Sequence, residues 1–350
     1  MKIQKIEAYQ IDLPYSGGVY RLSGGREYHS FDATIVRVIT DTGLEGWGES
    51  TPFGSNYIAA HARGVRAGLE EVAPAVIGLD PRKFDRLNDF MDQALMGHNH
   101  VKTPIDVACW DIFGKSTGLP VCDLLGGRIN KPVPLISSIG SSTDPEDMRL
   151  RVQQHRDRGF MGHSVKIGAS EAEGGPLLDA ERIRACLADR KPGEWFLVDA
   201  NGGLTVEHAL RMLSLLPDGM EFVLEAPCAS WSETQSLRNR CNVPLLLDEL
   251  VQTEADIIQA ITQNTCDGVG LKISKQGGLT RTRRQRDISY AAGLVMSIQE
   301  TTGSEIAFAA ILHMAQSTPR NLLRCALDPR AMVSQSTAEF DAPIINGGAT

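Results

Sequence analysis

The sequence of 350 residues lacks the features of several specialised protein classes. It has no apolar stretch near the ~18 residues that a membrane span needs, and its start, MKIQKIEAYQIDLP, alternates like a strand instead of forming the apolar core of a signal peptide. The seven cysteines are scattered and include no CxxC pair, which predicts reduced thiols and a cytoplasmic location. The net charge of −8 argues against nucleic acid or an anionic membrane as a partner.

What remains is an ordinary globular composition, with 42% hydrophobic and 22% charged residues. The length suffices for two domains, or for one barrel with additions.

The first part of the chain, 1–125, has the pattern of an α+β unit. Alternating, β-branched segments predict strands first, and helical periodicity follows them. The predicted strands are 3–13, 32–40 and the segment after the turn at 41–43, and the predicted helices are 57–75, 82–96 and one that starts at Thr103-Pro104, as an N-cap followed by proline.

From residue 126 to 325 short apolar runs alternate with helical stretches. The runs are VPLISSI, HSVKI, WFLVDAN, EFVLEAP, VPLLLDE, GVGLKIS, LVMSIQE and NLLRCAL. Eight such units in about 200 residues favour a closed parallel barrel over an open sheet. Residues 326–350 do not continue this rhythm, and we expect them to pack back on the N-terminal unit.

Five of the apolar runs end in a charged residue. These residues are Lys166, Asp199, Glu225, Asp248 and Lys272, and they follow one another at intervals of 23 to 33 residues, the length of a βα unit. Because all strand ends of a parallel barrel point to the same face, the five residues are predicted to surround one cavity.

The three carboxylates, Asp199, Glu225 and Asp248, predict a site for a hard divalent cation, for which Mg²⁺ is the natural choice. No histidine or cysteine joins them, which disfavours zinc. The alternative is that each carboxylate caps the helix after its strand.

The two lysines, Lys166 and Lys272, are candidate acid/base groups on opposite sides of a substrate. Alternatively they only balance the carboxylates, or one of them forms a Schiff base, although that chemistry needs no metal. Lys275 and Lys115 are read as solvated structural lysines.

Several of these segments together resemble the enolase superfamily, in its muconate-lactonizing-enzyme subgroup. They are GLEGWGES (43–50), KTPIDVACWDIFGKSTGLPVCDLLGG (102–127), VDAN, LEAP, LDE and GLKISKQGGL. The resemblance implies an α/β fold, a modified TIM barrel (β/α)7β with an N-terminal α+β capping domain. It also implies that Asp199, Glu225 and Asp248 bind Mg²⁺, that Lys166 and Lys272 are the catalytic pair around an enediolate, and that the protein is a homo-oligomer.

One position departs from the family pattern. The usual Lys-x-Lys of the second barrel strand is here Ser164-Val165-Lys166, so the catalytic lysine is kept and its neighbour is serine. This change affects how the pKa of Lys166 is tuned.

The loop 13–32, the GHNH segment at 97–100 and the two lysines resemble family members that act on proline derivatives, namely cis-3-hydroxy-L-proline dehydratases and proline-betaine epimerases. The threonine after Glu300, where the betaine enzymes carry tryptophan, favours a free imino acid over a quaternary ammonium. Residues expected to contact this small carboxylate substrate are Ser164, Asn201, Glu300, Tyr20 and His98, with His100 as a weaker candidate.

The leading hypothesis is Mg²⁺-dependent dehydration of cis-3-hydroxy-L-proline to Δ1-pyrroline-2-carboxylate, with 2-epimerisation as a competing outcome. The alternatives are an epimerase of proline betaine or other amino-acid derivatives, and a non-catalytic barrel that binds a metabolite.

Overall fold

The computed structural model describes residues 1–340, 342–345 and 347–350 of the chain. Its N-terminal domain is built on an antiparallel sheet in the order β1-β4-β5, formed by β1 (Ile3–Pro14), β4 (Ser30–Thr40) and β5 (Glu45–Ser50). The loop between β1 and β4 carries a small hairpin of β2 (Tyr20–Leu22) and β3 (Arg26–Tyr28), joined by η1 (Ser23–Gly25).

Two helices, α1 (Ala62–Val76) and α3 (Asn99–Thr117), pack on this sheet. The helix α2 (Phe84–Ala94) packs against both of them, and the short α4 (Val121–Leu124) follows α3. Their apolar faces and the inner face of the sheet form one buried cluster, which includes Val36, Val38, Leu69, Val72, Met91, Ile105 and Ile112. Burial of this apolar surface is the main force that holds the domain together.

The predicted start of the third helix at Thr103-Pro104 is wrong, because α3 already begins at Asn99 and contains Pro104 in its second turn. Contacts with the barrel extend the helix toward its N-terminus. The Asn99 side chain donates to the carbonyl of Lys275 at 2.8 Å. Thr103 Oγ1 lies 3.0 Å from the Asn99 carbonyl and 3.1 Å from that of Ser274.

The second part of the chain is a closed barrel of eight parallel strands, as the sequence predicts. Strands β6 to β13 pair in order, and β13 pairs with β6 to close the ring. The strands are β6 (Val133–Ile139), β7 (Gly162–Lys166), β8 (Trp195–Asp199), β9 (Val223–Glu225), β10 (Leu245–Leu247), β11 (Gly268–Lys272), β12 (Val295–Gln299) and β13 (Leu323–Leu327).

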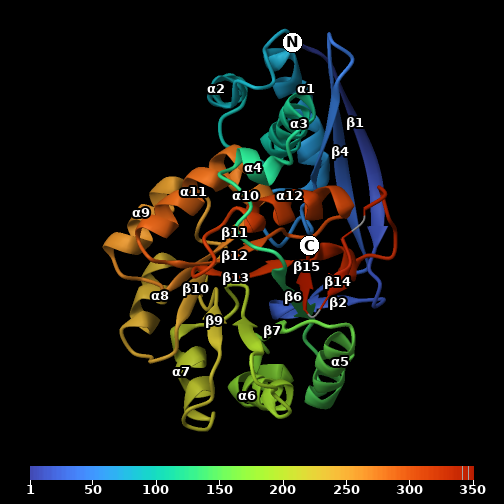
Figure 1. Ribbon diagram of the computed structural model, residues 1–350. Helices are drawn as coiled ribbons and strands as arrows, with labels where there is room; N and C mark the ends of the chain where they lie inside the picture. Colours follow the sequence, from blue (N-terminus) through green and yellow to red (C-terminus); the bar gives the residue numbers. More distant parts are fainter. Residues whose placement is uncertain (341, 346) are drawn as a thin grey trace.

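Helices connect each strand to the next and form the outer layer of the barrel (Figure 1). They are α5 (Pro145–Asp157), α6 (Gly175–Leu187), α7 (Val206–Ser214), α8 (Trp231–Arg238), α9 (Glu254–Thr262), α10 (Ile273–Gln276), α11 (Leu279–Ala291) and α12 (Glu305–Gln316), with the 3-10 turn η2 (Glu171–Glu173) before α6. Seven connections join the eight strands, because α10 and α11 lie together between β11 and β12. Within the described residues β13 is followed by η3 (Pro329–Met332) and by no further α-helix, so the fold is a (β/α)7β barrel with a capping domain.

The C-terminal segment contacts both parts of the molecule. The backbone of Ser16 donates to the carbonyl of Met332, and that of Ser334 to the carbonyl of Pro14. The hairpin of β14 (Ile344–Ile345) and β15 (Gly348–Ala349) is added to the sheet beside β6 of the barrel.

The N-terminal domain covers the carboxyl ends of the barrel strands. Glu49, at the end of β5, is buried and accepts hydrogen bonds from the backbone of Ser304 at 3.0 Å and of Ala307 at 3.2 Å, at the start of α12. A carboxylate at a helix N-terminus interacts favourably with the helix dipole. Thr301 Oγ1 donates to the carbonyl of Thr51 at 2.6 Å. These contacts join residues 49–51, at the end of β5, to the barrel.

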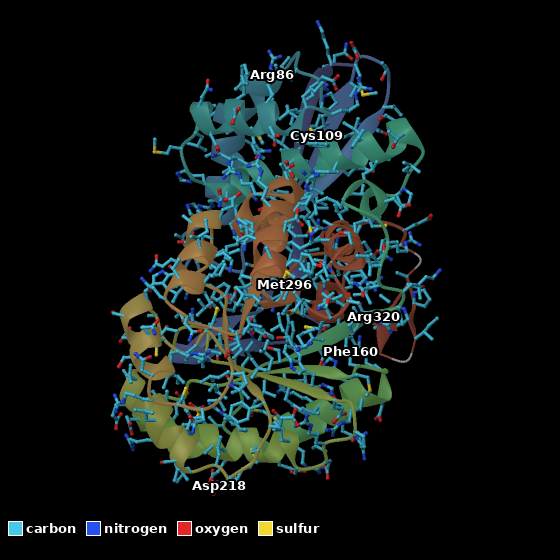
Figure 2. All side chains as sticks on the ribbon, turned by 60° about the vertical axis from the view of Figure 1, so that its left-hand side comes forward. Arg86, Cys109, Phe160, Asp218, Met296 and Arg320 are labelled. Atoms are coloured by element: carbon cyan, nitrogen blue, oxygen red, sulfur yellow. The ribbon has the colours of Figure 1, made fainter. Side chains whose placement is uncertain are left out.

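Seen from a second side, the molecule keeps this two-part shape. Arg86 of α2 and Asp218, which follows α7, lie at opposite ends of it (Figure 2). Across the residues described, we find no helix with the length and apolar character that crossing a bilayer demands.

Candidate active site

Five consecutive barrel strands, β7 to β11, lead into the charged residues singled out in the sequence, which are Lys166, Asp199, Glu225, Asp248 and Lys272. All are buried, with 1% to 8% of their surface exposed. The parallel ladders pair Lys166 with Asp199 and Asp199 with Glu225, so these residues lie at one level of the barrel.

The two lysines stand on opposite sides of the barrel axis. In the closed ring of eight strands, β7 and β11 are separated by four steps in either direction. The carboxylates occupy the three strands of one arc between them, and β12, β13 and β6 form the other arc. The site therefore has an acidic wall flanked by two amines.

The outer carboxylates are each paired with lysine. Lys166 Nζ donates to Asp199, and Lys272 Nζ donates to Asp248. Lys275 Nζ also donates to Asp248 Oδ1, at 2.6 Å. Lys275 is thus buried at the site, and its interpretation as a solvated lysine is wrong. Lys115 does lie at the surface, beside Asp111.

The central carboxylate, Glu225, has no such partner. Among the described residues its side chain accepts one hydrogen bond, from Gln299 Nε2 at 3.2 Å. Burial, followed by the charges of Asp199 and Asp248, raises the pKa of Glu225 well above its ordinary value. A buried carboxylate between two others, with one neutral donor, is an environment that a divalent cation would stabilise.

The donor set fits Mg²⁺ in chemistry, as oxygen ligands from three neighbouring strand ends. As the side chains stand, the described part of the chain holds no group of three or more histidine, cysteine, aspartate or glutamate side chains converging on one ion. The reason is that Asp199 and Asp248 turn toward the lysines. Binding of a cation would require them to exchange ammonium partners for the metal.

These ion pairs also set the protonation of the lysines. Burial by itself lowers the pKa of Lys166, but the nearby acidic groups, with Asp199 first among them, together outweigh burial and raise this pKa above the usual value. For Lys272 burial is likewise outweighed, chiefly by Asp248, and its pKa is raised as well. Both amines are therefore ammonium ions while the carboxylates hold them, and a base requires the neutral amine.

A small cavity of about 30 Å³ lies between the barrel mouth and the capping domain. Its lining includes both lysines and four of the five predicted substrate contacts, Tyr20, Ser164, Asn201 and Glu300. The floor is apolar, formed by Ile136, Leu197 and Leu327.

Three of these contacts have defined partners. The Tyr20 hydroxyl forms a short hydrogen bond with Ser138 Oγ of β6. Asn201 Nδ2 donates to Asp199 Oδ2 at 3.0 Å. Glu300 accepts from the Ser274 backbone at 2.7 Å, and burial raises the pKa of Glu300 to about 7.

The fifth predicted contact, His98, lines a neighbouring groove instead of the cavity. It is the N-cap of α3 in a left-handed conformation, with φ of 49°. The groove is larger, about 690 Å³, and is also lined by His100, Arg281 and Lys275. His100 is buried, and burial lowers its pKa to about 3, so this imidazole is neutral. The GHNH segment therefore lies beside the cavity.

Sequence reasoning missed three polar residues at the site. Ser138 is the last residue but one of β6, which ends at the apolar Ile139, so a rule that takes the final residue of each apolar run does not find it. Lys275 follows Lys272 by three residues, within one helical turn. Tyr57, from the loop between β5 and α1, lines both the cavity and the groove, and its only sequence signal was an aromatic residue in the Gly-Ser-Asn loop GSNY.

Comparison with known proteins agrees with this geometry. The model of the enolase C-terminal domain-like family matches residues 147–350, and that of the mandelate racemase/muconate lactonizing enzyme N-terminal domain matches residues 26–126. A cis-3-hydroxy-L-proline dehydratase from Roseibium aggregatum is 37% identical over 350 residues, which is 100% of this chain and 94% of that protein. An N-succinyl-L-Arg/Lys racemase from Bacillus cereus is 28% identical over 91% of this chain and 85% of its own length.

A solved structure is more similar still. The crystal structure of a protein from Roseovarius nubinhibens, assigned as a mandelate racemase/muconate lactonizing enzyme and complexed with magnesium, superposes with a TM-score of 0.99 at 67% identity. The match covers 100% of this chain and 94% of that one. With both domains matched over most of its length, this chain belongs to the mandelate racemase/muconate lactonizing enzyme family of the enolase superfamily, whose members among its relatives include a dehydratase and a racemase.

Proposed function

We propose that this enzyme is a Mg²⁺-dependent hydro-lyase that converts cis-3-hydroxy-L-proline to Δ1-pyrroline-2-carboxylate and water. The observation that carries the proposal is the position of Lys166 and Lys272 on opposite sides of one cavity at the mouth of the closed barrel. The relative from Roseibium aggregatum, named for this reaction, supports the substrate.

The stereochemistry of the substrate matches two opposed amines. In cis-3-hydroxy-L-proline the hydroxyl and the carboxylate share one ring face, so the α-proton and the hydroxyl lie on opposite faces. One lysine, as the neutral amine, takes the α-proton and leaves an enediolate. The other, as an ammonium ion, gives a proton to the C3 oxygen as the C3–O bond breaks, and water leaves. The enamine then moves a proton from nitrogen to C3 and becomes the imine.

Asp199, Glu225 and Asp248 are the proposed metal ligands. Bound Mg²⁺ would hold the substrate carboxylate and offset the negative charge that builds on its oxygens. Three further residues that line the cavity are proposed to contact the substrate. Ser164 and Asn201 face its polar end, and Tyr20 covers the substrate from the capping domain.

Glu300 is the proposed partner of the substrate nitrogen. It is buried, lines the cavity and follows β12, beside the strand that carries Lys272. Its pKa of about 7 reflects the cost of burying this carboxylate. A secondary ammonium at hydrogen-bond distance would remove that cost. A quaternary betaine nitrogen has no N–H to donate, so this carboxylate favours a free imino acid.

The test is to incubate the enzyme and Mg²⁺ with a panel of proline derivatives in D₂O and to follow the products by ¹H NMR. We expect pyrroline-2-carboxylate from cis-3-hydroxy-L-proline and α-deuterium exchange with unsubstituted proline. Finding neither exchange nor a pyrroline product with any member of the panel would overturn the proposal.

The second candidate function is 2-epimerisation of an amino-acid derivative. It is favoured by the same pair of opposed lysines, because one can remove the α-proton and the other can return a proton to the opposite face. The racemase from Bacillus cereus supports this alternative. The chirality of the recovered substrate separates the two functions, since an epimerase yields the D-isomer without loss of water.

We further propose the domain limits 1–125, 126–325 and 326–350, a cytoplasmic location and a homo-oligomeric state. Limited proteolysis, cell fractionation and light scattering would test these three points separately.

A further inference from the structure

Tyr57 connects the capping domain to one catalytic lysine. Lys272 Nζ donates a hydrogen bond to the Tyr57 hydroxyl at 2.7 Å, and this hydroxyl donates to Glu249 Oε1 at 2.8 Å. Asn201 Nδ2 donates to the same Glu249 oxygen at 3.1 Å. The tyrosine therefore lies in a chain of polar contacts between the end of β10 and the end of β11.

The ring of Tyr57 is held from the capping domain. Phe53 packs against it edge-on, with ring centroids 5.6 Å apart. The guanidinium of Arg26 lies 5.6 Å from the ring centroid, and Lys272 Nζ lies 5.1 Å from it. The amine lies beyond the hydroxyl end of the ring, so the hydrogen bond to the hydroxyl is the contact that fixes its position.

The partners of Lys272 show why this contact matters. Within the described residues, Lys272 Nζ has two hydrogen-bond partners, Asp248 and Tyr57. Asp248 is a proposed metal ligand, and a cation bound there would compete with this amine for the carboxylate oxygens. Tyr57 would then be the remaining hydrogen-bond partner of Lys272 Nζ among the described residues.

Lys166 lacks an equivalent contact. Its partner is Asp199, and the nearby tyrosine of the capping domain, Tyr20, is bonded to Ser138 instead. The two lysines occupy equivalent positions across the barrel, but the described structure gives only one of them a direct hydrogen bond to the capping domain.

We propose that Tyr57 is a positioning residue for Lys272, so that it governs proton transfer on one face of the substrate and leaves the other face to Lys166. The proposal rests on the proposed function, in which the lysines serve opposite faces. Removal of the hydroxyl leaves a mobile amine, and a misplaced acid or base costs rate without a loss of binding.

Tyr57→Phe removes the hydroxyl and keeps the ring that separates the cavity from the groove. The matched control is Tyr28→Phe. Tyr28 donates to Asn56 Oδ1 at 2.8 Å, within the same loop region, and does not line the cavity. This control measures the effect of loosening the loop without touching Lys272.

The measurement is α-proton exchange of L-proline and D-proline in D₂O with the Mg²⁺-loaded enzyme. Proline has no 3-hydroxyl, so exchange isolates the transfer of the α-proton. Lys272→Ala identifies the enantiomer whose exchange depends on Lys272. For that enantiomer we expect Tyr57→Phe to lower kcat about 10- to 100-fold, the size of one lost hydrogen bond to a charged group. Exchange of the other enantiomer, and all rates of Tyr28→Phe, should stay within about twofold.

An equal loss for both enantiomers, or no loss for either, overturns the proposal. If wild-type enzyme exchanges neither enantiomer, the proposed function fails, and the position of the amine still tests Tyr57. Crystal structures of Mg²⁺-loaded wild type and Tyr57→Phe should show Lys272 Nζ bonded to the tyrosine in the first and displaced in the second. An amine that keeps its position without the hydroxyl contradicts the proposal.

Discussion

The two sides of the active site each carry a lysine that we propose to be catalytic, in different surroundings. On the β11 side Lys272 shares Asp248 with a second lysine, Lys275, and contacts the capping domain through Tyr57. On the β7 side Lys166 is paired with Asp199, and the family's neighbouring lysine is replaced by Ser164. The difference indicates that the barrel strands determine the positions of the two lysines, while the neighbouring side chains determine the pKa and the hydrogen bonds of each amine.

The largest expected effect comes from removal of the proposed Mg²⁺, which both sides of the site share. Chelation of Mg²⁺ should abolish dehydration, at least ~10³-fold, because the charge on the substrate carboxylate is then no longer offset. Rates measured before and after EDTA treatment, and after readdition of Mg²⁺, test this. Full activity with excess chelator would contradict it.

The variant Glu225→Gln tests the proposed metal site through thermal stability. In the metal-free protein this variant should raise Tm by a few degrees, because it removes a carboxyl group whose charged form is disfavoured by burial and by two neighbouring carboxylates. It should also lose the rise in Tm that Mg²⁺ gives the wild type. Calorimetry with and without Mg²⁺ gives both results, and an unchanged Mg²⁺ response would exclude Glu225 as a ligand.

The next prediction separates the two sides of the site. Lys166→Ala and Lys272→Ala should each lower dehydration by ~10²–10⁴-fold, the range for loss of a general acid or base. Each variant should keep α-proton exchange with only one enantiomer of proline. If both variants lose exchange with the same enantiomer, the lysines do not serve opposite faces.

How much of the fold and of the site could be predicted from the sequence depends on how far apart in the chain the residues that determine each feature lie. The strand-end residues were predictable because an apolar run and its final polar residue are neighbours in the chain, and a parallel barrel brings all such ends together. The start of α3, the burial of Lys275 and the contact of Tyr57 were not, since each depends on residues more than 20 positions away. His98 was misplaced for the same reason, because its loop lies against the groove.

The variant Ser164→Lys restores the Lys-x-Lys pattern of the family on the β7 side. Ser164→Lys places a second ammonium near Lys166, which disfavours the charged form and lowers the pKa of Lys166. The pH dependence of the exchange that requires Lys166 should then move to lower pH by ~1 unit. Ser164→Met has a side chain of similar bulk without charge and should leave the pH dependence unchanged. A shift with methionine as well would assign the effect to packing.

The smallest effect is on stability and belongs to the β11 side. Burial raises the folded-state pKa of Glu300 to about 7, above the ~4.3 of an unfolded chain. Between these two pKa values the folded state binds one proton more at Glu300 than the unfolded state does. The free energy of unfolding is therefore higher at low pH and falls as pH rises toward 7. Glu300→Gln should therefore gain up to about 3 kcal/mol relative to wild type between pH 5 and pH 8. Urea unfolding of both proteins at these two pH values measures the difference, and an equal difference at both would refute it.

The central claim, that two amines act on opposite faces of one ring, is tested most directly with the two diastereomers of 3-hydroxy-L-proline. In the cis isomer the α-proton and the hydroxyl are on opposite faces, and in the trans isomer they are on the same face. With Mg²⁺-loaded enzyme, ¹H NMR should show pyrroline-2-carboxylate formed from the cis isomer and little or none from the trans isomer. Equal rates of dehydration for the two would contradict the claim.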